Sequence, residues 1–176
     1  MPGEEGEYEF DPFNWEDPGD GLSPKSHGLW KPVIAAVNGM ACGGAFYMLG
    51  EVEFIIAAEH ATFFDPHLTY GAAAILEPTL MATRMPFGEI MRISLMGNSE
   101  RVSARRAYEI GLVSEVVPAA DLLAHAQQVA AEIAEAPTVP TQATVRNLWL
   151  SREPARRNAL DLGNFLLNEI RARTNG

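Results

Sequence analysis

The sequence predicts an α/β fold that ends in a helical third. Two short apolar runs, residues 31–37 and 53–58, have the length and the β-branched content of buried strands. Between them, a turn signal and a glycine pair lead into an apolar segment, residues 45–49, that is typical of a helix. A strand, a helix and a strand at this spacing favour a right-handed crossover, so we expect one packed α/β layer.

The remaining elements are indicated by the same kinds of pattern. Ser103 is placed to cap a helix that runs to Ile110, and Gly111 suits the left-handed position after it. Apolar residues at helical spacing predict a long helix over residues 121–136. The other expected elements are strands at 61–64 and 112–117 and helices at 77–85, 88–96, 141–150 and 154–173.

The chain divides into three regions by composition. Residues 1–30 form a Pro- and Gly-rich leader that carries eight acidic residues and one basic residue, Lys25. Residues 31–118 form the α/β core, and residues 119–176 form a helical C-terminal subdomain. Because the leader has no apolar period of its own, we expect a long loop that lies against the core.

Charge and composition limit the classes of function. The 13 basic and 23 acidic residues give a net charge of −10, which disfavours nucleic acid as a partner. No apolar run reaches the roughly 18 residues that a membrane-spanning helix needs, and the acidic N-terminus does not resemble a signal peptide. The single cysteine, Cys42, excludes an internal disulfide framework. We therefore expect a soluble, cytoplasmic protein with no membrane partner.

Residues 31–44 read Lys-Pro-Val-Ile-Ala-Ala-Val-Asn-Gly-Met-Ala-Cys-Gly-Gly and resemble the signature of the crotonase (enoyl-CoA hydratase/isomerase) superfamily. The resemblance continues through residues 53–64 and returns at residues 101–117. It implies a crotonase-like spiral of ββα units whose N-terminal repeats are missing here. It also implies an acyl-CoA thioester as substrate, with coenzyme A as part of that substrate and no separate cofactor. Self-association into a homotrimer or hexamer through the C-terminal helices is implied as well.

The resemblance gives the glycine pair a chemical role. In this superfamily two backbone N–H groups bind the thioester oxygen where negative charge develops, and Gly44 matches one of these donors. Gly43 and Ala41 are expected to line the substrate site beside it. The physical reading agrees, because a residue without a side chain lets a substrate approach the backbone closely. Without the resemblance, the same glycines would be interpreted only as a turn between a strand and a helix.

The resemblance also locates the acid and base groups. Hydratase members carry two glutamates, and here Tyr47 and His67 stand at those positions. Tyrosine, with an ordinary pKa of about 10, is a poor base at neutral pH, whereas histidine, with a pKa of about 6.5, is a suitable one. Asp65 is a candidate to orient His67, and Glu77 is a candidate to replace a lost carboxylate. Both residues also have a purely structural interpretation: Asp65 as part of a turn with Pro66, and Glu77 as a residue at the start of a helix.

Two functions from different classes remain open at this point. The first is an enzyme that moves a proton next to a thioester, with Gly44 as oxyanion donor and His67 as proton carrier. Ordinary hydration by a glutamate pair is not supported. The second is a non-catalytic homologue that binds acyl-CoA or forms an oligomer. Because His60 and His125 have no partners at metal-ligand spacing, we expect no metal site.

Overall fold

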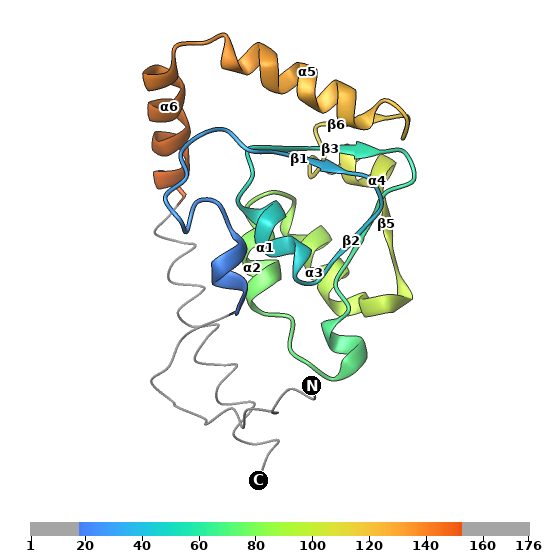
Figure 1. The fold of residues 1–176 in the computed structure, drawn as a ribbon. Coiled ribbons are helices and arrows are strands. Elements are labelled where there is room, and N and C mark those ends of the chain that lie inside the picture. Colours follow the sequence, from blue (N-terminus) through green and yellow to red (C-terminus); the bar gives the residue numbers. More distant parts are fainter. Residues whose placement is uncertain (1–17, 153–176) are drawn as a thin grey trace, which may run out of the picture.

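The computed structural model describes residues 18–152, and its strands form two small sheets (Figure 1). The first sheet is parallel throughout, in the order β1 (Ile34–Val37), β3 (Phe54–Ala58), β6 (Glu115–Val117). In the second sheet a parallel pair is followed by an antiparallel one, in the order β2 (Met40–Cys42), β4 (Thr62–Phe64), β5 (Val102–Ser103). The predicted strands are confirmed, with shorter bounds.

The chain passes twice from the first sheet to the second and then into helical structure. Only Asn38 and Gly39 separate β1 from β2, after which α1 (Ala45–Gly50) begins. Residues 59–61 separate β3 from β4, which is followed by the 3-10 helix η2 (His67–Tyr70) and by α2 (Leu76–Met81). This repeated strand–strand–helix arrangement is the one that the resemblance implies, and it confirms the α/β prediction.

The other helices agree with their predicted positions to within a few residues. Ser103 caps α4, because its hydroxyl accepts a hydrogen bond from the Arg106 amide at 3.2 Å, and Gly111 has a φ of 81° as expected. The predicted helix at 154–173 lies outside the described residues. The remaining elements are η1 (Pro18–Leu22), α3 (Phe87–Met96), η3 (Gly97–Ser99), α4 (Ala104–Glu109), α5 (Leu122–Ala134) and α6 (Thr138–Leu150).

The main core lies between the two sheets and the helices packed on them. Its fully buried side chains include Phe46, Ile55 and Phe63, one each from α1, β3 and β4. A smaller cluster forms where α5 crosses the outer face of the first sheet, with Ile56 against Leu122. Figure 1 shows α5 along the edge of the molecule above β1 and β3. Apolar burial of this extent is the main source of stability.

Five short elements were not predicted: β2, β5, η1, η2 and η3. Each has two to five residues, so no alternation or helical period can be read in it. The glycine pair was expected to lead directly from a turn into a helix, but residues 40–42 first pair with β4.

Within residues 18–152 no helix has both the length and the apolar character needed to cross a bilayer. A cytoplasmic location stays a prediction.

The described part of the leader, residues 18–30, lies against α1 and β3. The Ser23 hydroxyl donates to the Tyr47 carbonyl at 2.9 Å. The Lys25 amide donates to Glu51 Oε2 at 2.7 Å, and its side chain forms an ion pair with Glu53 at 2.9 Å. The Trp149 indole N–H donates to Glu53 Oε1 at 2.7 Å, so one carboxylate joins the leader, β3 and α6.

Candidate active site

The glycine turn leaves one backbone amide open. Gly43 has a φ of 48°, in the left-handed region that favours glycine, and α1 begins two residues later. Gly44 is exposed, and a Cβ built on it would meet no atom within 4 Å. Among residues 18–152 the Gly44 N–H has no hydrogen-bond acceptor. This amide is therefore free to bind an oxygen atom brought by a ligand.

Strand pairing brings His67 next to this turn. Cys42 and Phe64 are register partners in β2 and β4, so the residues that follow both strands emerge side by side. A Cβ built on Gly43 would lie 3.5 Å from Pro66 Cδ and 3.8 Å from His67 Cε1. A Cβ at this position would be in ordinary van der Waals contact with both atoms, so the His67 ring packs directly beside the glycine turn.

A fully buried carboxylate holds one side of the His67 ring. Asp65 is 0% exposed, and its Oδ1 accepts hydrogen bonds from the His67 backbone amide at 3.0 Å and from His67 Nδ1 at 2.6 Å. Its Oδ2 has no hydrogen-bond partner in the described part of the chain. The negative charge of Asp65 is therefore compensated almost entirely through His67.

A second carboxylate faces the opposite nitrogen of the ring. Glu77 lies in the first turn of α2, and its Oε1 is 3.3 Å from His67 Nε2. The hydrogen bond with Asp65, followed by the one with Glu77, raises the pKa of His67 from 6.5 to about 10, against an opposing effect of burial. At neutral pH His67 is therefore an imidazolium cation, and the ordinary pKa used in the sequence analysis does not apply.

Two other predicted site residues are packed into apolar clusters. Tyr47 is buried with Leu76 and Leu80, and a Cβ built on Gly19 would lie 2.2 Å from the Tyr47 ring. Gly19 of the leader therefore packs directly on that ring. Ala41 is part of the main core. A substrate contact by Ala41 or Tyr47 stays a prediction, whereas Gly43, Gly44, Asp65, His67 and Glu77 share one region.

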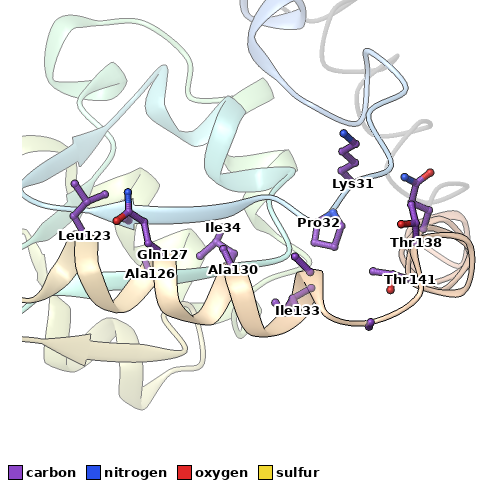
Figure 2. Close-up of a pocket in the computed structure, with 14 residues that line it drawn as sticks. Lys31, Pro32, Ile34, Leu123, Ala126, Gln127, Ala130, Ile133, Thr138 and Thr141 are labelled. Atoms are coloured by element: carbon purple, nitrogen blue, oxygen red, sulfur yellow. The ribbon is translucent and has the colours of Figure 1, made fainter.

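A pocket that the sequence analysis did not predict lies elsewhere in the fold (Figure 2). It has a volume of about 500 Å³ and opens between β1, α5 and the start of α6. Figure 2 shows Ile34 of β1 facing Ala126 and Ala130 of α5, with Thr138 and Thr141 at the far end. It shares no lining residue with the His67 cluster. Its lining combines residues of β1, α5 and α6 that lie far apart in the sequence, so no single motif could have signalled it.

In the described residues no group of three or more histidine, cysteine or acidic side chains is arranged to hold a metal ion. His125 is engaged instead with Glu115, at 2.6 Å between Nε2 and Oε2. The expected absence of a metal and of a separate cofactor stays a prediction.

The repeated strand–strand–helix arrangement, with a glycine turn beside a titratable cluster, defines a crotonase-type fold. A sequence model of the family described as enoyl-CoA hydratase/isomerase matches residues 19–172. The chain therefore belongs to the enoyl-CoA hydratase/isomerase family.

Relatives and solved structures agree with this assignment. The chain is 34% identical over 126 residues to an (E)-benzylidenesuccinyl-CoA hydratase from Thauera aromatica, covering 71% of this chain and 48% of that protein. It is 32% identical over 125 residues to a 2,3-dehydroadipyl-CoA hydratase from Escherichia coli, covering 71% of this chain and 49% of that protein. Its structure resembles that of an enoyl-CoA hydratase/isomerase from Mycobacterium paratuberculosis, with a TM-score of 0.73 and 35% sequence identity. The match covers 91% of this chain and 58% of that one. The chain spans about half the length of these two curated relatives.

Proposed function

We propose that this protein binds an acyl-CoA thioester and moves a proton on the carbon next to the thioester carbonyl. The thioester oxygen is bound by the Gly44 amide, and the Asp65–His67–Glu77 cluster supplies the acid–base chemistry. The observation that carries the proposal is the packing of the glycine turn against His67, 3.8 Å from a Cβ position on Gly43 to His67 Cε1. It brings an open amide and a titratable cluster to the same place.

The chemistry needs both parts. Removing the proton from the carbon next to a thioester creates an enolate whose charge lies largely on the thioester oxygen. A preorganised N–H donor stabilises that charge, and losing one such donor costs roughly 10²–10³ in rate in other enzymes. The similar proteins named above carry CoA esters in their names, which supports a thioester of coenzyme A as the substrate class.

Two-glutamate hydration is not part of the proposal. The position that the resemblance gives to the first glutamate is Tyr47, whose side chain is buried under the leader. One acid–base cluster remains, at the end of β4. A single cluster suits isomerisation or proton exchange, in which one group takes a proton and returns it. A second oxyanion donor would come from outside residues 18–152 or from another copy of the chain.

We also propose self-association, into a trimer or hexamer, through the C-terminal helices. Several large apolar side chains of α5 and α6 are exposed to solvent, and they are Leu123, Val139, Leu148 and Leu150. Exposed apolar side chains of this kind favour burial against another protein surface. Sedimentation velocity tests this part of the proposal, and a monomer at all concentrations would contradict it.

The decisive experiment removes the Gly44 N–H and keeps everything else. Gly44 has φ −52° and ψ −21°, so proline fits its φ, and Gly44→Pro deletes the donor. Gly44→Ala is the matched control, because its Cβ meets no neighbour and its amide remains. We expect exchange of acyl-CoA α-protons for deuterium, followed by NMR, to fall roughly 10²–10³-fold in the proline variant. The fall should be smaller in the alanine variant, which keeps the donor but adds a Cβ on the side that the substrate approaches. Equal rates in both variants would contradict the oxyanion role.

Thermal unfolding with and without acyl-CoAs of short, medium and long chain separates the two functions. A ligand that binds only the folded protein raises the midpoint of unfolding. A shift with acyl-CoA, but no proton exchange, would favour the non-catalytic alternative. Free coenzyme A is the control for binding that does not depend on the acyl group.

A further inference from the structure

The His67 ring lies between two carboxylates, and this placement determines its chemical form. Nδ1 lies 2.6 Å from Asp65 Oδ1, and Nε2 lies 3.3 Å from Glu77 Oε1. A neutral imidazole has one N–H donor and one lone pair, whereas an imidazolium has two donors. A lone pair directed at a carboxylate oxygen would be repelled, so both nitrogens carry protons. A ring in this form has no lone pair left with which to accept a further proton.

Asp65 makes this form hard to change. Its carboxylate is fully buried, and one of its oxygens has no partner among the described residues. Removing a proton from His67 would leave that buried charge without a cation, which is unfavourable in a protein interior. The charged residues of the neighbouring helix α3 do not offer a substitute, because Glu89 and Arg92 are engaged with Arg106 and Glu100. Asp65 therefore fixes the charge of His67 from inside the fold.

We infer that Glu77 is the group that accepts the substrate proton and that His67 is a positioning residue, a fixed cation that holds the Glu77 carboxylate in place. This inference rests on the proposed function. In the described part of the chain, His67 is the one ion-pair partner of Glu77, and its Nε2 lies beside a single carboxylate oxygen, Oε1. The other oxygen of Glu77 is then the one that can meet a substrate. From the sequence alone, His67 was predicted to be the proton carrier.

The proposed step conserves all atoms and electrons. The C–H bond next to the thioester carbonyl breaks, and its electron pair forms the enolate, whose oxygen is bound by the Gly44 amide. The proton forms an O–H bond on Glu77, which becomes a neutral acid while His67 keeps its charge. The reverse transfer returns a proton to the same carbon, for exchange, or to a conjugated carbon, for isomerisation. The step uses no oxidant, reductant or second substrate.

The test has one measurement that needs no substrate. In protein labelled with ¹⁵N-histidine, the signals that disappear in His67→Gln identify the His67 ring, and their shifts are followed against pH. We expect both ring nitrogens to stay protonated through neutral pH, with a transition near the value of about 10 that its two carboxylates produce. A transition near pH 6.5, the ordinary value for histidine, would overturn the fixed-cation role.

The second measurement is the rate of α-proton exchange in Glu77→Gln and His67→Gln. Both substitutions are close in size to the residues that they replace, and circular dichroism confirms folding. Loss of a general base costs typically 10²–10⁴-fold, which we expect for Glu77→Gln. For His67→Gln we expect a smaller loss and no change in the shape of the pH–rate profile between about pH 6 and 8. A wild-type inflection near 6.5 that vanishes in His67→Gln would overturn the assignment.

The two measurements separate this inference from the proposed function. Absence of exchange in the wild-type protein with every acyl-CoA would overturn both the proposed reaction and the role of Glu77. The ring titration would still decide the charge of His67. Exchange that survives in Glu77→Gln but is lost in Gly44→Pro would overturn only the role of Glu77.

Discussion

Two carboxylate–cation clusters in this molecule differ in how completely their atoms are paired. Around Glu53, one oxygen accepts from Lys25 Nζ and the Trp149 indole, and the other accepts from Lys25 Nζ and the Val33 amide. Lys25 Nζ also donates to the carbonyls of Leu29 and Lys31. The Lys25 side chain is 3% exposed. Every charged atom in this cluster has a partner within the protein.

The His67 cluster has the same kinds of charge but is left incomplete. The His67 side chain is 26% exposed. In the described residues Asp65 Oδ2 has no hydrogen-bond partner and Glu77 has one ion-pair partner, His67. Buried polar atoms are nearly always paired in folded proteins, so an unpaired one needs an explanation. The comparison indicates that the saturated cluster holds segments together and that the unsaturated one is available for chemistry.

The largest effect should come from breaking the saturated cluster. Lys25→Met removes the cation and leaves the Glu53 carboxylate with neutral donors only. Removing one partner of a buried ion pair typically costs about 3–5 kcal/mol of unfolding free energy, measured here by urea denaturation. Lys31→Met, at an exposed position, is the control and should change stability by less than about 0.5 kcal/mol. Equal losses of unfolding free energy in the two variants would mean that the Glu53 cluster does not stabilise the fold.

A smaller effect is expected at the third member of that cluster. Trp149→Phe keeps an aromatic ring beside Lys25, 5.8 Å from Nζ to the ring centre in the native protein, but deletes the N–H that binds Glu53. A hydrogen bond to a charged group contributes about 1.5–3 kcal/mol. Asn147→Ala is a matched control on the same helix, because Asn147 is an exposed polar residue outside this cluster. Denaturation midpoints of the two variants should differ clearly, with the loss confined to Trp149→Phe.

The smallest effect should be the pH dependence that His67 gives to stability, since its ring is partly exposed and solvent screens its charge. Its pKa is about 10 in the folded protein and about 6.5 when unfolded. Because the folded value is the higher one, the stabilisation is complete below pH 6.5 and is lost as pH rises through 10. Unfolding free energies at about pH 6, 8 and 10 should therefore decline more steeply for wild type than for His67→Gln. Parallel profiles would contradict the ion-pair geometry.

The sequence predicted the members of the site better than their arrangement. Asp65 and His67 are two residues apart and were paired correctly in the analysis, because a local turn suffices to bring them together. The approach of Gly43 to His67 depends on β2 pairing with β4, and β2 is too short to leave a pattern. The position of Glu77 depends on η2, a single turn that gives no periodic signal.

The Glu53 cluster was not predicted at all, for a related reason. Its residues are 28 and 96 positions from Glu53 along the chain, and none of them lies in a motif. From the sequence alone, a lone lysine in a leader and a tryptophan in a helix are each readily interpreted as surface side chains with an apolar stem or ring and a polar tip. Only the folded arrangement of leader, β3 and α6 brings them together. The apolar spacing over residues 121–136, by contrast, was visible in the sequence, and α5 packs Leu122 and Ala126 of that face against the first sheet.

The long separations in the Glu53 cluster also have a kinetic consequence. Contacts between residues far apart in sequence require large loops to close, so they tend to form late on the folding route. An interaction that is absent from the transition state slows unfolding without speeding folding. We expect Lys25→Met to change mainly the unfolding limb of a denaturant chevron, with the refolding limb almost unmoved. The lifetime of the native state, rather than the rate at which it is reached, would then be set by the carboxylate of Glu53.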